Sequence, residues 1–426
     1  MNKREMIKNK KNNARLYPIY KMFSWDLLFY YAISFVFLVQ IKGFSIAEVM
    51  LTDALYPIFK IILNIPCITI IDKIGKRKSL LLANIILATY LVLLIFCNGL
   101  LNLIFVYIIM AFAFTIKSIT ESNILYESVT NKKGKGMFSK IEEIGARNYY
   151  LLDGITSLST GFLFVINGYL PMIVSLMFAV VAIALTTCFK EIEEVKENKY
   201  EATLKQRILD YKEELVTSFK FIFKSHRLQA IMLFTLFFDG LIYTSYTLRE
   251  SMLTELGVSP EYFAIIVSSL TIVSGIFSSL QEKIHNKFRN RALTFIVSVY
   301  VPTFVVIGII SILNITWFVK LLLILAMYTI QYAMQSPYYT LSSVYIKNFT
   351  SSEIRTKISS TFDFIKSISQ ISIALFASYL LTVTNIGNNF IIIGILFLII
   401  MFMIIGYMKS RVGLKPEEYK EEDINF

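Results

Sequence analysis

The sequence predicts an all-α membrane protein with about twelve transmembrane helices in two pseudo-symmetric bundles of about six helices each. Three observations support this fold class. Of the 426 residues, 56% are hydrophobic and 15% are aromatic, and the mean hydropathy is +0.62, which is too apolar for an average soluble domain. Stretches of about 20 mostly apolar residues recur along the chain. Lys and Arg gather in alternate loops between these stretches, as expected for loops on the inner side of a membrane.

The apolar stretches define the expected helices in chain order. Their approximate bounds are 24–42, 47–71, 79–98, 101–127, 138–166, 169–189, 229–251, 260–281, 293–314, 316–344, 354–384 and 387–408. Loops expected outside, such as 98–99 and 167–168, are short and nearly free of Lys and Arg, whereas loops expected inside, such as 73–78 and 283–291, are basic. This alternation predicts an even number of spans with both chain ends in the cytoplasm.

The expected organisation has five parts. They are a basic cytoplasmic N-terminus (1–23), a first six-helix bundle (24–189), a cytoplasmic linker (190–228), a second six-helix bundle (229–408) and a cytoplasmic tail (409–426). In the linker, apolar residues recur at three- and four-residue steps from Leu204 to Ile222. This spacing predicts an amphipathic helix along the inner membrane face, and a solvated linker is the alternative.

The most specific motif lies between the second and third expected helices. It reads Asp72-Lys73-Ile74-Gly75-Lys76-Arg77, and Pro66 precedes it. The motif resembles the signature loop of the major facilitator superfamily, with Ile68 where that pattern has its first glycine. The resemblance implies a secondary transporter whose two bundles rock about a midplane site. It also implies that Asp72 and the basic residues after it lock the outward-facing state at the inner surface.

The two halves of the chain echo each other. Asp72-Lys73-Ile74 is matched by Glu282-Lys283-Ile284, and each triplet is followed by a basic cluster and another apolar run. Asp26 in the first expected helix is matched by Asp239 in the seventh. Because the echoes keep the same order, they favour a duplicated bundle.

Ionisable side chains inside the expected spans are candidate functional residues. Each costs about 2.5–3.5 kcal/mol at the bilayer centre and therefore faces a bundle interior or a wet cavity. The candidates for the substrate and proton pathway are Asp26, Tyr30, Lys60, Lys117, Glu121, Asp239, Tyr243, Gln331 and Gln335. The resemblance implies that the first, fourth, seventh and tenth helices line a central cavity. For each candidate, the alternative is a structural ion pair or an interface residue near a helix end.

Two further features bear on gating and on the branch of the family. Glu143 and Arg147 lie one turn apart near the inner end of the fifth expected helix, and we expect a gate or a structural pair there. The triplet Tyr126-Glu127-Ser128 resembles the end of the fourth helix in one bacterial branch of the superfamily. The fifth expected helix lacks the Gly-Pro signature of the drug exporters.

Other classes of function find no support in the sequence. It holds no ATP-binding loop, zinc-protease motif or serine-hydrolase motif, so we expect neither an enzyme nor a cofactor. Cys67, Cys97 and Cys188 have no paired spacing, and His226 and His285 fall in basic loops where we expect them to be solvated, so no metal site is predicted. The inside loops account for the net charge of +12, and no nucleic-acid partner is expected.

The predicted function is secondary active transport of a small molecule across a bacterial cytoplasmic membrane by alternating access. Coupling to protons or another ion is expected, with Asp26 or Glu121 titrating and Lys117 acting on Glu121 by charge proximity. The direction leans slightly to efflux of amphipathic compounds. The alternatives are an uncoupled or uptake facilitator and, from another class, a transporter-like membrane sensor or assembly partner. We expect a monomer in the lipid bilayer.

Overall fold

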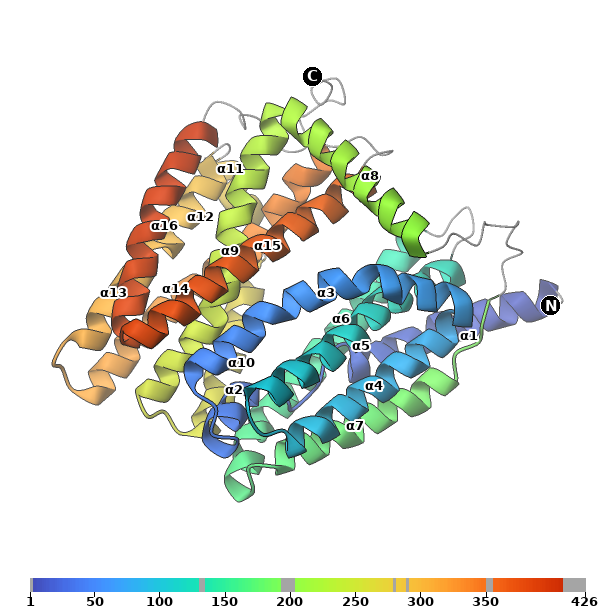
Figure 1. Cartoon of the computed structure of the whole chain (residues 1–426), viewed down its shortest axis with the longest axis horizontal. Helices are drawn as coiled ribbons and strands as arrows, with labels where there is room; N and C mark the ends of the chain where they lie inside the picture. The colour runs from blue at the N-terminus through green and yellow to red at the C-terminus, as the bar shows by residue number, and fades with distance from the viewer. Residues whose placement is uncertain are drawn as a thin grey trace. The chain divides into compact units, whose positions relative to one another are not determined.

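The computed structural model describes residues 3–129, 135–192, 204–278, 281–288, 291–349 and 355–408. Nearly all of these residues are helical, and the described ranges contain no strand (Figure 1). The elements are α1 (Lys3–Ser24), α2 (Ser34–Val36), the π-helix η1 (Phe37–Ile41), α3 (Ile46–Ile74), α4 (Lys76–Phe96), α5 (Leu100–Val129), α6 (Lys135–Ile166), α7 (Leu170–Thr187), α8 (Leu204–Lys224), α9 (His226–Glu255), α10 (Pro260–Ser278), α11 (Gln281–Phe288), α12 (Ala292–Tyr300), α13 (Pro302–Ile312), α14 (Trp317–Asn348), α15 (Arg355–Val383) and α16 (Ile386–Met408).

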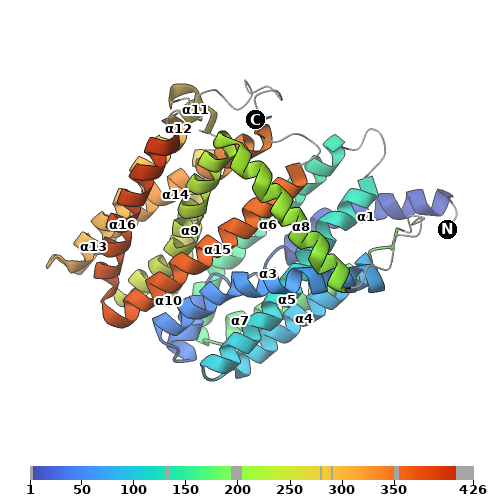
Figure 2. The same ribbon diagram turned by 45° about the horizontal axis from the view of Figure 1, so that its top comes forward.

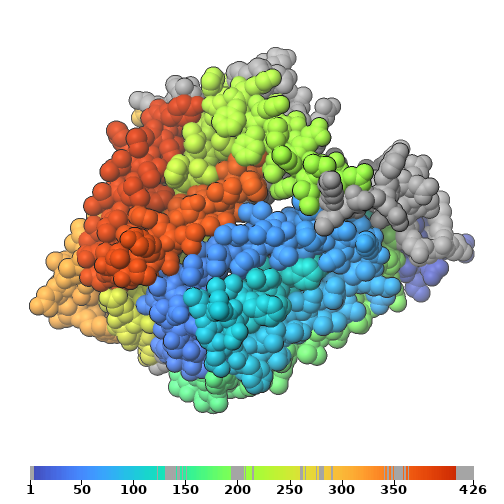
Figure 3. Space-filling model, viewed as in Figure 1, coloured from blue at the N-terminus to red at the C-terminus, as the bar shows by residue number. Residues whose placement is uncertain are grey.

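Among the described residues, ten helical segments are long and apolar enough to cross a membrane. Their outer faces carry large apolar side chains that the protein leaves exposed, such as Phe96, Leu101 and Phe402. Apolar side chains on these faces suit contact with lipid. The helical backbone suits lipid as well, because a helix satisfies its own hydrogen bonds where the lipid offers no partners. The outer faces of α4 and α16 form part of the surface seen in Figure 3. The all-α, multi-span fold class is confirmed, and twelve spans are compatible with it.

The chain divides into two compact units. The first comprises Met1–Phe44, Ile58–Ile208 and Ser259–Ile265, and the second comprises Ser45–Pro57, Leu209–Val258 and Ile266–Phe426. The first part of α3 therefore packs with the second unit. The helix α8 lies in the segment 190–228, where the amphipathic linker helix was expected, whereas the tail 409–426 lies outside the described residues. The five-part organisation stays a prediction.

In the first unit, α4 packs against α5 and α7, and α1 packs against α5, α6 and α7 (Figure 2). Tyr17 and Tyr20 of α1 are fully buried in a cluster with Leu125 and Phe189. This packing explains why the polar start of the chain is helical: Tyr17 and Tyr20 lie on one buried stripe, whereas Ile7 and Ile19 remain exposed.

The start of the chain corrects the predicted bounds of the first helix. We expected a helix over 24–42, but α1 already covers Lys3–Ser24, and regular helix resumes only at Ser34. Asn13 fastens α1 to the end of α7: its Nδ2 donates to the carbonyl of Lys190 at 2.8 Å, and the Lys190 N–H donates to its Oδ1 at 2.9 Å. Hydropathy missed α1 because only one narrow stripe of this helix is apolar.

In the second unit, α9 packs against α15 and α16, and α13 packs closely against α16. Gly308 of α13 makes this closeness possible. A Cβ atom there would lie 2.6 Å from the carbonyl oxygen of Gly387 and 3.0 Å from the amide nitrogen of Ile391. Since backbone atoms cannot move aside as a side chain can, any residue larger than glycine would force the two helices apart.

The short helix α11 lies where the sequence predicted a basic loop. His285 on α11 is 5% exposed, and its Nδ1 lies 3.4 Å from the hydroxyl of Tyr345 on α14. The prediction that His285 is solvated is therefore wrong. The helix places the imidazole against α14, while the lysines of α11 remain exposed.

Candidate functional site

The first unit has a break in its first helix at Asp26. After α1 ends at Ser24, the chain turns irregularly until Ser34, and Phe29 has a φ of +66°. A bulky residue is unfavourable in this left-handed region, so the surrounding packing must hold it there. The Asp26 Oδ1 accepts a hydrogen bond from the N–H of Leu27 at 3.0 Å, which competes with continued helix. The last carbonyl groups of α1 are consequently open to polar side chains.

The Lys117 ammonium group lies at this open end of α1. Lys117 on α5 is 2% exposed, and its Nζ donates to the carbonyl oxygen of Trp25 at 3.3 Å. A cation is stabilised at this position because a helix is electrically negative at its C-terminal end. Glu121, one turn further along α5, is also buried, and the carboxylates of Glu121 and Asp26 both attract Lys117. Three of the predicted pathway residues thus form one ionic cluster at the helix break.

A small cavity adjoins this cluster in the first unit. Asp26, Lys117 and Asn84 line it together with apolar side chains of α4 and α7, and it can hold about one water molecule. The amide of Asn84 on α4 donates to the hydroxyl of Tyr20 at 3.0 Å and to that of Thr186 at 2.9 Å. The polar surface therefore continues from the helix break across α4 to α7.

Tyr30 fastens the irregular segment to α4. Its hydroxyl and that of Tyr90 are 2.5 Å apart, and the two rings meet edge to face with centroids 5.7 Å apart. Both side chains are almost completely buried. The hydrogen bond gives Tyr30 a positioning role beside Asp26.

The signature loop is organised by an acidic residue that the sequence analysis did not single out. The carboxylate of Glu191, just after α7, accepts hydrogen bonds from the amides of Lys76 at 2.9 Å and Arg77 at 3.1 Å, and so caps α4. Gly75 before them has a φ of +85°, and a Cβ there would lie 3.0 Å from the Glu191 Oε1. The motif therefore needs glycine at this position for its conformation, and an added Cβ would also press on the capping carboxylate.

Side chains of the loop reach two more elements of the first unit. The Lys76 ammonium group forms an ion pair with Glu127 of α5, and the Arg77 guanidinium donates to the carbonyl of Thr187 at 2.8 Å. Asp72 and Lys73 are exposed at the end of α3. The basic residues thus join α4, α5 and α7 on one side of the unit.

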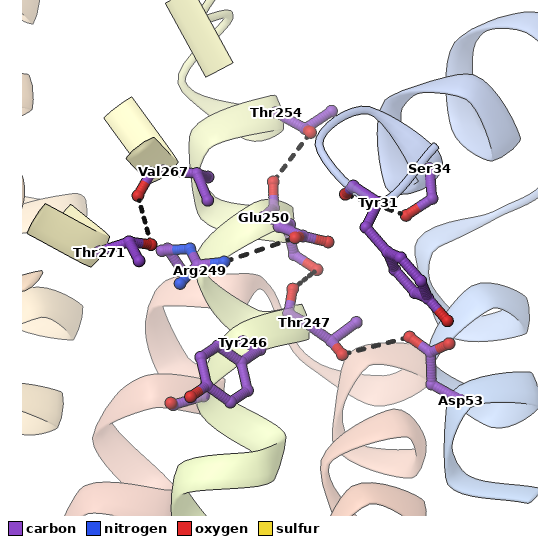
Figure 4. A network of polar contacts seen from close by, with 12 residues as sticks. Tyr31, Ser34, Asp53, Tyr246, Thr247, Arg249, Glu250, Thr254, Val267 and Thr271 are labelled. Atoms are coloured by element: carbon purple, nitrogen blue, oxygen red, sulfur yellow. Dashed lines mark hydrogen bonds and ion pairs between the residues drawn. The ribbon is translucent and has the colours of Figure 1, made fainter. Parts of the chain in front are cut away.

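In the second unit, Asp239 of α9 is paired with a lysine. Its carboxylate is 2% exposed and lies 3.0 Å from the Nζ of Lys366 on α15, whose side chain is 22% exposed. Tyr243, one turn further along α9, donates its hydroxyl to the carbonyl of Asp53 at 2.7 Å. Thr247 donates to the Asp53 carboxylate at 3.3 Å (Figure 4). A stripe of polar residues on α9 therefore joins α15 to the first part of α3.

The two predicted glutamines lie in a second polar cluster of this unit. The Gln335 side chain accepts from the Tyr246 hydroxyl at 3.1 Å and donates to the Tyr300 hydroxyl at 3.4 Å. Gln331 donates to the hydroxyl of Thr303 at 2.7 Å. The amide groups of α14 thus connect α9 to α12 and α13.

Arg249 belongs to the same cluster, and the sequence analysis missed it. Its guanidinium group donates to the hydroxyl of Tyr332 and lies over the rings of Tyr246 and Tyr332, with centroids 5.4 and 5.3 Å away. It also lies 3.4 Å from the carboxylate of Glu250 (Figure 4). The side chain is 4% exposed, and its Nε–H has no hydrogen-bond partner among the described residues. An unpaired buried donor costs about 1–3 kcal/mol, and more when it is charged. The expected helix ended at residue 251, which placed Arg249 at a membrane boundary, whereas α9 continues to Glu255.

Three more of the predicted residues lie on α3 and α6. Lys60 is half-buried on α3 in the first unit, and Arg147 is exposed on α6. Glu143 also lies on α6, but its side chain is outside the part of the chain that the structure describes. The expected pair of Glu143 and Arg147 therefore stays a prediction.

The fold is that of a family of membrane transporters. The chain belongs to the Major Facilitator Superfamily, whose family model matches residues 22–330. Among curated protein sequences, none matches this chain.

Solved structures of transporters share the fold. The nucleoside transporter NupG is 14% identical, with a TM-score of 0.67 and coverage of 94% of this chain and 99% of that chain. A bacterial homologue of the human lysosomal transporter Spinster is 13% identical, with a TM-score of 0.68 and coverage of 96% and 98%. A POT family transporter in complex with a thioalcohol-conjugated peptide is 12% identical, with a TM-score of 0.66 and coverage of 96% of both chains. Identities this low show the fold alone.

Proposed function

We propose that this protein is a proton-coupled secondary transporter that moves a small amphipathic molecule across a bacterial cytoplasmic membrane by alternating access. The observation that carries the proposal is the Lys117 ammonium group at the broken end of α1, with two buried or half-buried carboxylates beside it. Discontinuous helices whose freed carbonyl groups face a cation are a recurrent feature of transporter sites. The alternation of basic and uncharged loops in the sequence supports the proposed placement of both chain ends in the cytoplasm.

In this proposal, Lys117 takes the place that a coupling cation occupies at a broken helix. A proton on Asp26 or Glu121 weakens the attraction of that carboxylate for Lys117 and frees the ammonium group to leave the Trp25 carbonyl. Loss of the proton restores the ion pair and draws α5 back towards the end of α1. Protonation thereby controls the position of the helix break, which is the element that we propose to move.

The signature loop has a supporting role in the proposal. The cap that Glu191 provides for α4 and the ion pair between Lys76 and Glu127 hold the ends of α4, α5 and α7 together. A bundle that rocks as one body needs such ties between its own helices. We propose that the loop makes the first unit rigid, so that movement concentrates at the helix break.

Proteoliposomes that contain a pH-sensitive dye test the proposal. The purified protein is challenged with a panel of amphipathic amines, amino acids, peptides, nucleosides and aromatic acids, with a proton gradient of either sign. A transported compound is expected to dissipate the gradient, and export in exchange for protons is the direction to test first. Asp26→Asn or Glu121→Gln should abolish the coupled signal, whereas Asp210→Asn on the exposed face of α8 should leave it unchanged.

The outcomes separate the alternatives. If both carboxylate variants retain gradient-driven transport, the coupling assignment is wrong and an uncoupled facilitator takes its place. If compounds bind in a thermal-stability assay but never cross the membrane, the protein is a sensor rather than a transporter. If the compound instead moves in the same direction as the protons, the protein is an uptake system.

A further inference from the structure

We propose that the substrate carries a single carboxylate group, which Arg249 recognises in the second unit. This inference deepens the proposed function, on which it rests, because it gives the chemical class of the transported molecule. It depends on the charge and hydrogen bonding of the Arg249 guanidinium group and on the side chains around it.

Among the described residues, only some of the hydrogen-bond donors of the guanidinium group have partners. One terminal nitrogen donates to the Tyr332 hydroxyl, and the other forms an ion pair with the carboxylate of Glu250 at 3.4 Å, near the limit for a hydrogen bond. The Nε–H is buried and has no partner in the described part of the chain. The Nε–H and the neighbouring terminal N–H form an edge that matches the two oxygens of one carboxylate.

The charges around Arg249 favour a singly charged ligand. Glu250 already contributes one negative charge, and its side chain is 23% exposed, so it can turn towards water when another carboxylate arrives. The exchange of one carboxylate for another leaves the local charge unchanged. A phosphate dianion would add a second negative charge beside a single guanidinium group, which is unfavourable in a buried site.

The side chains around Arg249 also favour a substrate whose remaining part, apart from the carboxylate, is apolar or aromatic. The rings of Tyr246 and Tyr332 lie within cation–π distance of the guanidinium group and offer flat faces beside it. Figure 4 shows Tyr246 and Glu250 near Arg249. Gln335, which accepts from the hydroxyl of Tyr246, provides an amide group in the same cluster. An aromatic or amphipathic monocarboxylate therefore fits these side chains better than a small hydrophilic acid.

Matched acids and amides test the inference on the full-length protein in detergent. The probes are N-acetyl-L-tyrosine, L-alanyl-L-phenylalanine and indole-3-acetate, each compared with its primary amide by thermal stability and by titration, with phenyl phosphate as the dianion. At least one acid is expected to bind at least tenfold more tightly than its amide. Arg249→Gln should remove this preference, Arg249→Lys should keep part of it, and Arg291→Gln at an exposed position should preserve it.

A panel without any preference for an acid over its amide overturns the inference, as does stronger binding of phenyl phosphate than of the acids. Because the comparison of acid with amide uses the unaltered protein, it holds even if Arg249→Gln fails to fold. Tyr332→Phe, which removes the hydroxyl that orients the guanidinium group, should weaken the acids more than the amides. Transport of a neutral compound would overturn this inference and uphold the proposed function. Binding of an acid that never crosses the membrane would uphold this inference and overturn the proposed function.

Discussion

The ion pair between Asp239 and Lys366 allows a quantitative test of how charge is stabilised within the second unit. At the observed 3.0 Å, the attraction between unit charges is about 5–6 kcal/mol for an effective dielectric constant of about 20, before the loss of hydration is subtracted. Breaking a buried pair typically costs about 3–5 kcal/mol, because the remaining charge is left uncompensated. The two partners differ in exposure, so the two single substitutions should not be equivalent.

Lys366→Met leaves the Asp239 carboxylate charged at 2% exposure, and we expect the free energy of unfolding to fall by about 3 kcal/mol, at the low end of that range. Asp239→Asn leaves Lys366, whose side chain is 22% exposed and can reach water, so a loss of about 1–2 kcal/mol is expected. In the double variant both charges are absent, and the loss should be about 0–1 kcal/mol. The coupling energy of the double-mutant cycle should therefore be about 3 kcal/mol or more.

The assay is equilibrium unfolding in mixed micelles with increasing dodecyl sulfate, followed by circular dichroism. Lys283→Met, at an exposed lysine of α11, is the matched control and should change the unfolding free energy by less than about 0.5 kcal/mol. Two results would refute the argument. One is a loss for Lys366→Met that equals that of the control, and the other is a larger loss for Asp239→Asn than for Lys366→Met.

Three further predictions concern the helix cap, the close helix contact and the helix break. Glu191→Ala should lower the free energy of unfolding by about 0.5–2 kcal/mol through loss of the α4 cap, while Glu213→Ala on exposed α8 should not; equal midpoints for the two variants in the same micelle assay would contradict this cap. Gly308→Ala should cost about 1–3 kcal/mol because the new methyl group meets the backbone of α16, and Gly406→Ala, where the added atom meets nothing within 4 Å, is its control. Lys117→Met should remove the cation from the end of α1 and abolish transport in proteoliposomes, and unchanged transport would show that the ammonium group is dispensable.

Sequence analysis predicted the parts of the candidate site that depend on residue type. Intramembrane charge is costly, so Asp26, Lys117 and Glu121 were recognised one by one as functional candidates. Their grouping came from the structure, because it depends on a helix break that no glycine or proline announces between residues 25 and 33. Tertiary packing holds Phe29 in the left-handed region there, and local propensity carries no information about such packing.

Two omissions have a similar origin. Glu191 was placed in a linker, since nothing in the local sequence tells that its carboxylate turns back to cap a helix that begins 115 residues earlier in the chain. Arg249 was passed over although the expected helix 229–251 contains it, because its contact with Tyr332 joins two helices that are distant in the chain. An Arg-Glu pair that follows a run of polar residues on one helix face is the signal that could have found it.

The sequence by itself determined that this protein folds in lipid, that basic and uncharged loops alternate along it, that its spans are helical and to which family it belongs. These properties follow from the transfer of apolar segments into lipid and from the retention of basic residues on one side, and both effects are read one segment at a time. Only the tertiary structure decided where the first helix breaks, which carboxylates meet which cations, and which donor of Arg249 has no hydrogen-bond partner among the described residues. Those features arise from contacts between helices distant in the chain, where the packing of one side chain against another outweighs the preference of either.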